Sequence, residues 1–360
     1  MLQSSDAPRA EARTRSLAFG TAFTDHMVSM AWDAGRGWHD TEVVPHAPLV
    51  VDPAMVGLHY GQSVFEGLKA HRVPGGVAVF RPDAHAVRLR ASARRLMMPE
   101  LPEAEFLAAV DALVGVDQGA LPDDPDVSMY LRPIIFASER TLALRPAREY
   151  RFLLMAFLTE GYFGSGQRPV SVWVTTEFSR AAPGGTGFAK CAGNYAGSLM
   201  AQEAAKEQGC DQVVWLDPVE RRWVEEMGGM NLFFVRGSGS GARLVTPPLN
   251  GNLLPGVTRD SILRLAPDLG IPAAEEMVSI EDWRAGCESG EISEVFACGT
   301  AARITAVGEV KSKEGCWTIG DGSCGEVTSR LFEALSGFQG GRLPDRYGWL
   351  RRIPAGERER

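Results

Sequence analysis

The lysines of this chain are few, and one of them lies in surroundings that suit covalent chemistry. The 360 residues include five lysines against 32 arginines. Lys206, Lys311 and Lys313 lie among polar residues, as surface charges do. Lys190 instead stands in the segment PGGTGFAKCAGNYAG, whose small residues let a planar ligand approach closely. Apolar surroundings disfavour a protonated amine and make it a better nucleophile, so Lys190 is a candidate for a Schiff base with a carbonyl compound.

A Schiff-base lysine serves either a cofactor-free aldolase or pyridoxal phosphate (PLP), and PLP needs two further groups. They are an acid for its pyridine nitrogen and an anion site for its phosphate. Glu225 and Glu226 offer the acid, although a solvated acidic face explains such a pair equally well. Residues 255–256 (Pro-Gly) precede a helical pattern that Thr258 can cap, and the free N–H groups at a helix start bind anions. Residues 298–302 (CGTAA) follow a strand pattern and add a hydroxyl.

Composition argues against several other classes of protein. A net charge of −8, from 37 basic and 45 acidic residues, makes a nucleic-acid binder less expected. All six histidines lie in the first quarter and no GxSxG motif occurs, which disfavours an α/β-hydrolase. The six cysteines form no CxxC pair, so we expect no metal site, reduced thiols and a cytoplasmic protein. The longest apolar run, Phe152 to Leu158, is too short to cross a membrane.

The elements that must position these residues follow from hydrophobic periodicity. Strands and helices alternate irregularly in both halves, which predicts an α+β fold. We expect a disordered N-terminal segment over 1–22, a small domain over 23–162, a linker over 163–172 and a large domain over 173–360. Residues 25–80 should form strands and tight turns, and a Gly-rich hairpin loop is expected at 237–241. Further helices are predicted at 84–96, 103–116, 194–208 (ended by Gly209), 258–265 and 326–338, and strands at 129–136, 152–158, 170–176, 212–216, 223–226 and 231–235.

Seven motifs, taken in order, carry a resemblance to a known family. They are GLHYGQSVFEGLKAHR, RLRASARRLMMP, YLRP, GGTGFAKCAGNYAGS, EEMGGMN, LLPGVTRDS and EVFACGTAA. From about Phe23 to about Gly348 the chain resembles the fold-type IV PLP enzymes, and most closely the bacterial branched-chain amino-acid aminotransferases. The resemblance implies two mixed α/β domains with PLP at their interface, and a homodimer. It also implies transamination between L-leucine, L-isoleucine or L-valine and 2-oxoglutarate.

The same resemblance implies roles for the residues of the cofactor site. Lys190 would be the catalytic lysine and also bind PLP. Glu226 rather than Glu225 would hold the pyridine nitrogen, because it lies five residues before Asn231 as the family motif requires. Tyr195 would contact the phenolic oxygen of the cofactor. The phosphate would be bound by Arg88, Val257, Thr258 and Thr300.

The substrate pocket implied by the resemblance has aromatic walls and one cationic end. Arg132 would receive the distal carboxylate of glutamate, and Tyr60 would reach the site across the dimer interface. Backbone N–H groups of the CGTAA loop would bind the α-carboxylate. The substrate-binding set is therefore Tyr60, Phe65, Gly67, Tyr130, Arg132, Tyr162, Ala301 and Ala302.

The chain also departs from the family pattern. Animal members carry a CxxC redox pair where this chain has Ala302 and Thr305, so no thiol switch is expected there. Gly229 replaces a threonine near the substrate. Neither Cys191 nor Lys69 has a role that the sequence assigns.

Other functions remain open at this point. A specialised aminotransferase acting on a modified or aromatic amino acid in a secondary-metabolite pathway would need few pocket changes. A D-amino-acid transaminase or an aminodeoxychorismate lyase shares the fold type, although YLRP with GTAA favours the L-branched-chain pattern. A cofactor-free Schiff-base lyase would need neither Glu226 nor an anion site, and a silent PLP-binding protein would keep the residues without turnover.

Overall fold

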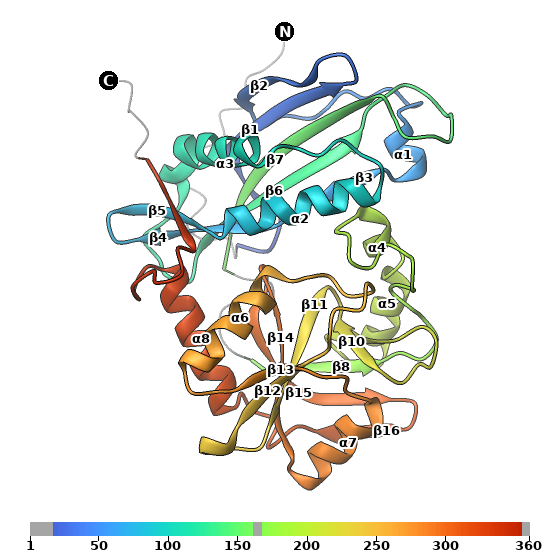
Figure 1. Cartoon of the computed structure of the whole chain (residues 1–360), viewed down its shortest axis with the longest axis vertical. Coiled ribbons are helices and arrows are strands. Elements are labelled where there is room, and N and C mark those ends of the chain that lie inside the picture. The colour runs from blue at the N-terminus through green and yellow to red at the C-terminus, as the bar shows by residue number, and fades with distance from the viewer. Residues whose placement is uncertain (1–16, 161–167, 355–360) are drawn as a thin grey trace.

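The computed structural model describes residues 17–160 and 168–354, and it divides into two parts placed one above the other (Figure 1). Each part is built on its own β-sheet and its own buried core. Residues 163–167 of the predicted linker and residues 1–16 of the predicted N-terminal segment lie outside the described residues, whereas residues 170–172 of that linker already belong to strand β8 (Val170–Val174). The domain limits expected from the sequence therefore stay a prediction.

The first part is an antiparallel sheet covered by two helices. Among the described residues its sheet has eight strands, in the order β17-β5-β4-β6-β7-β1-β2 with β3 paired to β6. Helices α2 and α3 bury Leu89, Phe106, Val110 and Leu113 in the core of this sheet. The strands are β1 (Ala22–Asp33), β2 (Gly37–Pro45), β3 (Ser63–Phe65), β4 (Leu68–Val73), β5 (Gly76–Phe80), β6 (Ser128–Ala137) and β7 (Glu149–Thr159), and the helices are α1 (Val56–Tyr60), α2 (Pro82–Arg95), α3 (Glu103–Asp117) and η2 (Gln118–Ala120).

The second part is a sheet that closes on itself. Within the described residues it has nine strands in the order β10-β9-β8-β15-β14-β11-β12-β13, with β16 paired to β15. An additional pairing of β10 with β11 closes the path from β10 to β11 into a ring. The strands are β8 (Val170–Val174), β9 (Gln212–Leu216), β10 (Val224–Met227), β11 (Met230–Arg236), β12 (Arg243–Thr246), β13 (Ala273–Glu275), β14 (Ile292–Gly299), β15 (Arg303–Ser312) and β16 (Gly315–Thr318).

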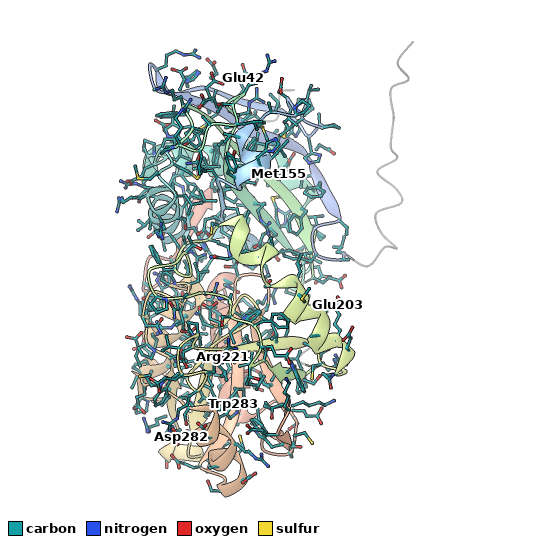
Figure 2. All side chains as sticks on the ribbon, turned by 90° about the vertical axis from the view of Figure 1, so that its right-hand side faces the viewer. Glu42, Met155, Glu203, Arg221, Asp282 and Trp283 are labelled. Atoms are coloured by element: carbon teal, nitrogen blue, oxygen red, sulfur yellow. The ribbon has the colours of Figure 1, made fainter. Side chains whose placement is uncertain are left out.

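Helices surround the closed sheet and pack buried side chains against its strands. Trp283 is fully buried and meets the ring of Phe234 edge-on at 5.2 Å between centroids. Figure 2 places Trp283 in the lower part and Met155 in the upper part. The helices are α4 (Ala192–Ala196), α5 (Leu199–Glu207), α6 (Val257–Asp268), α7 (Ile280–Ser289), α8 (Glu326–Gln339) and η3 (Gly239–Gly241).

The last strand returns to the first sheet. After α8 the chain runs upward in Figure 1, and β17 (Leu350–Ile353) pairs antiparallel with β5. Residues 350–353 therefore belong to the sheet of the first part, although the sequence analysis assigned 173–360 to the large domain. Two arginines in LRRI hide this strand from a hydrophobic pattern.

Most predicted helices and strands are confirmed, with two local corrections. The helix expected at 194–208 is two helices, because the chain turns at Gly197 and Ser198 between α4 and α5. Thr258 does not cap α6: the helix begins one residue earlier and its N-cap is Gly256, so Thr258 lies in the first turn. Gly209 does follow α5 in the left-handed conformation, with φ of 68°. No helix within 17–160 and 168–354 has the length and hydrophobicity to cross a membrane.

Candidate active site

A cavity of about 290 Å³ lies where the two parts meet. The first sheet contributes Phe65, Tyr130 and Arg132 to its wall. The second part contributes Lys190 with α4, the start of α6 and the loop between β14 and β15. Residues from segments that are far apart in the sequence thus surround one space, as at most small-molecule sites.

Lys190 is fixed at this junction by contacts from the first part. Its backbone N–H donates to Ser92 Oγ at 2.9 Å, and its carbonyl accepts from Phe65 N at 2.9 Å. Its side-chain Nζ donates to the hydroxyl of Tyr195 at 2.8 Å and lies 5.1 Å from the centre of the Phe65 ring. Tyr195 is on α4, which begins at Ala192, two residues after the lysine. The structure brings together this predicted pair.

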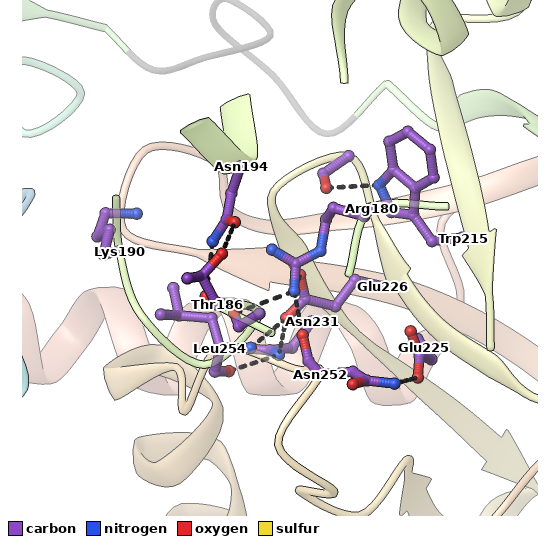
Figure 3. Close-up of polar contacts among 12 residues, drawn as sticks. Arg180, Thr186, Lys190, Asn194, Trp215, Glu225, Glu226, Asn231, Asn252 and Leu254 are labelled. Carbon is purple, nitrogen blue, oxygen red and sulfur yellow. Dashed lines mark hydrogen bonds and ion pairs between the residues drawn. The ribbon is translucent and has the colours of Figure 1, made fainter. Parts of the chain in front are cut away.

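The carboxylate of Glu226 is held by three donors beneath the cavity. Leu254 N donates to Oε1 at 2.7 Å, Asn231 Nδ2 donates to Oε1 at 3.2 Å, and Arg180 Nη2 lies 3.0 Å from Oε2 (Figure 3). Glu226 is 1% exposed, and burial raises the pKa of its carboxyl while Arg180 opposes that shift. Glu226 does not itself line the cavity; its partners Arg180 and Asn231 do.

The strand geometry separates the two neighbouring glutamates. Glu226 pairs in register with Asn231 across the tight turn between β10 and β11, which explains the five-residue spacing in the sequence. Successive side chains of a strand point to opposite faces. Glu225 therefore points away from Asn231 and accepts hydrogen bonds from Asn252 at 2.7 Å and Asn250 at 3.3 Å.

Arg88 is not an exposed helix charge but a buried member of a charged cluster. It is 7% exposed, and its Nε and Nη2 donate to the two carboxylate oxygens of Glu66 at 2.7 and 2.8 Å. His85 Nδ1 lies 2.8 Å from Glu66 Oε2. The third nitrogen, Nη1, donates to Pro255 O at 3.1 Å, just before α6. Arg88 and Glu66 form a bidentate pair, which fixes the guanidinium plane.

The start of α6 has the donors that an anion needs. Val257 and Thr258 lie in its first turn, where helical N–H groups have no partner inside the helix. Both residues line the cavity, as do Arg88 and Thr300. Gly256 lets this turn approach the sheet, because a Cβ there would lie 2.1 Å from Asn231 Oδ1. A guanidinium, a helix start and a hydroxyl form a donor set that fits a phosphate.

Six of the eight predicted substrate residues line the same cavity. The guanidinium carbon of Arg132 lies 4.9 Å from the centre of the Phe65 ring and 5.5 Å from that of Tyr130. Gly67 admits no side chain, because a Cβ would lie 1.8 Å from the Tyr130 hydroxyl oxygen. The six residues are Phe65, Gly67, Tyr130, Arg132, Ala301 and Ala302.

Two predicted substrate residues are not found in the cavity of this chain. Tyr60 is 49% exposed at the end of α1, and its hydroxyl donates to Leu142 O at 2.9 Å. Its location outside the cavity is compatible with the expectation that it serves a partner subunit. Tyr162 lies outside the described residues.

Sequence reasoning missed several residues that support the site. Arg180 holds Glu226, and Glu66 holds Arg88. Lys69 is 2% exposed, and its Nζ donates to Ala301 O at 3.2 Å. A lysine in the alternating strand pattern around FEGLKAHR was the available signal for Lys69.

Two of the unusual residues now have a structural setting. Cys191 is 3% exposed and packs in the core of the first part, so it is a buried apolar contact between the parts. Gly229 lines the cavity, and a Cβ there would lie 3.5 Å from the Tyr195 ring, so its space admits a side chain. No group of His, Cys, Asp and Glu suited to a metal occurs in the part of the chain that the structure describes.

Comparison with protein families gives one matching family model. The model described as amino-transferase class IV matches residues 63–310. Among curated proteins, a branched-chain-amino-acid aminotransferase of Mycobacterium tuberculosis is 54% identical over 350 residues, which are 97% of this chain and 95% of that protein. A branched-chain-amino-acid aminotransferase of Mycolicibacterium smegmatis is 53% identical over 93% of this chain and 92% of that one.

Solved structures agree with the sequence comparisons. The branched-chain amino acid aminotransferase of Escherichia coli superposes with a TM-score of 0.75 at 31% identity, covering 91% of this chain and 99% of that one. The branched-chain aminotransferase of the thermophilic archaeon Thermoproteus uzoniensis, solved with norvaline, superposes with a TM-score of 0.71 at 26% identity, covering 90% and 99%. Another branched-chain amino acid aminotransferase, complexed with N-(5'-phosphopyridoxyl)-L-glutamate, superposes with a TM-score of 0.72 at 28% identity, covering 90% and 98%.

Proposed function

This chain belongs to the class IV aminotransferases, among the branched-chain amino-acid aminotransferases, and we propose that the residues around Lys190 form its active site. It transfers the amino group between L-leucine, L-isoleucine or L-valine and 2-oxoglutarate, giving branched-chain 2-oxo acids and L-glutamate. The class depends on PLP. The observation that carries the assignment of the site is the pairing of Lys190 Nζ with the Tyr195 hydroxyl at 2.8 Å inside the junction cavity.

PLP fits the donor set of this cavity. Arg88, Thr300 and the first turn of α6, with Val257 and Thr258, would hold the phosphate. Tyr195 would hydrogen-bond the phenolic oxygen, and Glu226 would pair with the pyridine nitrogen. When bound, PLP supplies an electron sink that stabilises negative charge at Cα of the amino acid.

The amine of Lys190 moves the proton in the reaction. Its Nζ is held toward the cavity by Tyr195 and by the ring of Phe65, so it can take a proton from Cα of the bound amino acid and return it. Tyr195 orients this amine through its hydroxyl oxygen. Glu226, clamped by Leu254 N, Asn231 and Arg180, keeps its carboxylate in one place throughout the reaction.

The substrate end of the cavity has one cation on an aromatic wall. A branched aliphatic side chain would contact Phe65 and Tyr130, whereas the distal carboxylate of glutamate would pair with Arg132. The N–H groups of Ala301 and Ala302 would bind the α-carboxylate. The same cavity thus accepts an apolar side chain and an acidic one in alternate half-reactions.

We also propose a homodimer in which Tyr60 of one subunit completes the substrate site of the other. Tyr60 is half-exposed in the single chain, although the family resemblance gives it a substrate role. We place the enzyme in the cytoplasm, as expected from its cysteine content. Sedimentation analysis tests the dimer, and subcellular fractionation tests the location.

Steady-state kinetics with amino donors against 2-oxoglutarate test the proposed site. Lys190→Ala should lose at least about 10³-fold in kcat, because among the described residues no other lysine lines the cavity to move the Cα proton. Lys206→Ala is the matched control: Lys206 lies on the exposed face of α5 and pairs with Glu203, so its loss should leave turnover unchanged.

Two further observations separate the site from its rivals. L-Leucine, L-isoleucine and L-valine should be the preferred donors, and D-enantiomers should be inactive. Turnover that survives Lys190→Ala would refute the assignment of the lysine. A preference for D-amino acids would refute the substrate assignment while leaving the site intact.

A further inference from the structure

A second polar cavity, here called the rear pocket, lies behind the loop that joins β14 to β15. Its volume is about 110 Å³. It lies between the two parts: β4 and the segment before β6 form one side, and Arg303 with α8 forms the other. No residue of the rear pocket is used by the proposed active site.

Four buried polar atoms around the rear pocket have no hydrogen-bond partner among the described residues. They are His71 Nε2, Arg303 Nε, Ser336 Oγ and Gln339 Oε1. His71 is 5% exposed and Gln339 6%. Burying a polar atom without a partner is unfavourable, and such groups are rare in native proteins. Their convergence on one cavity points to a polar ligand that satisfies several of them at once.

The charges around the rear pocket favour an anion. Arg303 is largely buried, its Nη2 donates to the backbone oxygen of Asp126 at 3.3 Å, and the carboxylate of Asp126 is the acidic group that acts on its charge. Burial together with the positive charges of Arg303 and Arg342 holds the pKa of His71 well below its usual range. His71 therefore stays neutral and offers one N–H donor.

Two acidic side chains also belong to the lining and limit the net charge. Asp124 and Asp126 are exposed at the rim, and Asp124 accepts a hydrogen bond from the N–H of Asp126. The donors of Arg72 already reach the backbone oxygens of Gln118 and Leu121. Arg303 and the rim residue Arg342 remain as cations for a ligand.

The donors match a small oxyanion. Arg303 Nε–H and the hydroxyl of Ser336 can donate to anionic oxygens, and the neutral ring of His71 can add a third donor. Gln339 Oε1 can accept from a ligand hydroxyl. Monohydrogen phosphate has such a hydroxyl, and so does a hydroxy carboxylate.

We propose that the rear pocket binds a small oxyanion, a phosphate or the carboxylate of a small metabolite, and that the bound anion changes substrate affinity through Arg303. Arg303 directly follows Ala302 and adopts φ of 56°, a conformation uncommon for residues other than glycine. Lys69, two residues before His71 on β4, donates to Ala301 O. A ligand bound to Arg303 thus adjoins the loop of Ala301 and Ala302, which we assign to the α-carboxylate of the substrate. The coupling rests on the proposed function, whereas the binding does not.

Calorimetric titration of the PLP-loaded enzyme, without substrate, tests the binding. Inorganic phosphate and lactate are the two probes, with chloride at equal ionic strength as the blank. Arg303→Gln should weaken binding about tenfold or more, because a charged hydrogen bond is lost. Ser336→Met should abolish binding by filling the cavity. Arg284→Gln is the charge-matched control, because Arg284 lies on the exposed face of α7. This variant should bind the probes as wild type does.

The outcomes distinguish a phosphate ligand, a carboxylate ligand and a pocket that holds only water. Saturable binding of one probe per chain, lost in both pocket variants, identifies phosphate or carboxylate as the ligand chemistry. If neither probe binds saturably, or if Arg303→Gln and Ser336→Met bind like wild type, the pocket holds only water and the proposal is wrong.

Kinetics then test the coupling. The probe that binds should change the KM for glutamate in wild type, because Arg303 directly follows Ala302 in the loop assigned to the α-carboxylate. The change should vanish in Arg303→Gln. An equal rise of KM in wild type and Arg303→Gln would mean competition in the active site and would refute coupling. Failure of all turnover would count against the proposed function and leave the titration result standing.

Discussion

The paired residues Arg88 and Glu66 show how single contacts build the anion site. Both side chains are buried, and their bidentate hydrogen bonds fix the guanidinium between α2 and the start of α6. Although burial acts to raise the pKa of the Glu66 carboxyl, the charges of Arg88 and His85 hold that pKa well below its usual range. Glu66 is therefore a positioning residue: it stays charged and orients the arginine that we assign to the phosphate.

Removing the charge of Glu66 should destabilise the protein strongly. Glu66→Gln leaves Arg88 buried without its counter-charge, and breaking a buried ion pair costs about 3 to 5 kcal/mol. The thermal midpoint of the holoenzyme measures the loss. Glu100→Gln is the control, because Glu100 pairs with the well-exposed Arg94 and such pairs contribute about 1 kcal/mol or less. Equal effects of the two variants would contradict the role given to Glu66.

Lys69 should make stability depend on pH in a definite direction. Burial and the nearby charge of Arg303 hold the pKa of Lys69 well below 10.5, its ordinary value. Between the lowered pKa and 10.5 the unfolded chain binds a proton that the folded chain does not. Stability therefore rises with pH in this window, by at most about 1.4 kcal/mol per pH unit.

Comparison of wild type with Lys69→Met isolates this contribution. The stability of the variant minus that of wild type should be largest at pH 7. This difference should shrink as the pH approaches 10. Thermal midpoints at pH 7, 8.5 and 10 measure it. Lys206→Met, on the exposed face of α5, should show a difference near zero throughout. A constant offset for Lys69→Met would mean that the lysine is protonated in the folded chain.

At the scale of elements, the hairpin of β10 and β11 and the start of α6 act together. Asn231 donates to Glu226 and also to Leu254 O, which lies in the segment leading into α6. Gly256 lets the first turn of α6 lie against Asn231. The acid proposed for the pyridine nitrogen and the helix start proposed for the phosphate are thus linked through one amide.

Gly256→Ala should disturb both ends of the cofactor site. The new Cβ would lie 2.1 Å from Asn231 Oδ1, and Asn231 cannot move without releasing Glu226. Such overpacking costs about 1 to 3 kcal/mol, so PLP affinity should fall about tenfold or more. Fluorescence titration of the apoenzyme with PLP measures it. Gly115→Ala in α3, where a Cβ meets nothing within 4 Å, should leave PLP affinity unchanged.

Local patterns explain why some elements were predictable and others were not. α2 and α3 each bury one face, so helical periodicity predicts them, and β6 and β7 are predictable because each is a continuous apolar run of strand length. The break between α4 and α5 was hidden because the buried residues Asn194, Ala201 and Ala205 keep helical spacing across it. β17 was hidden because it gains its stability from pairing with β5, a contact between distant parts of the chain.

The site was predictable to the extent that its residues share a short motif. Lys190 and Tyr195 lie only five residues apart, and Glu226 and Asn231 face each other across one hairpin. Arg180 instead reaches Glu226 from a distant loop. No spacing in the sequence encodes such a contact, which depends on how the second sheet closes.

At the scale of the whole molecule, one end of the first part has exposed apolar side chains around Tyr60. Leu58 is 60% exposed, Leu142 56% and Leu144 86%. Tyr60 donates to the backbone of Leu142, so these residues form one surface. An exposed apolar patch of this kind is typical of an interface, which agrees with the proposed dimer.

If Tyr60 completes the active site of the partner subunit, two defective chains should restore one another. In a mixed dimer of Lys190→Ala and Tyr60→Ala chains, one site lacks both groups. The other has Lys190 from one chain and Tyr60 from its partner. Random mixing of equal amounts gives half mixed dimers, so activity should recover to about a quarter of wild type. Unfolding and refolding the two variants together, with each variant refolded alone as control, measures the recovery. Activity no higher than the mean of the controls would place Tyr60 in its own subunit's site or outside both.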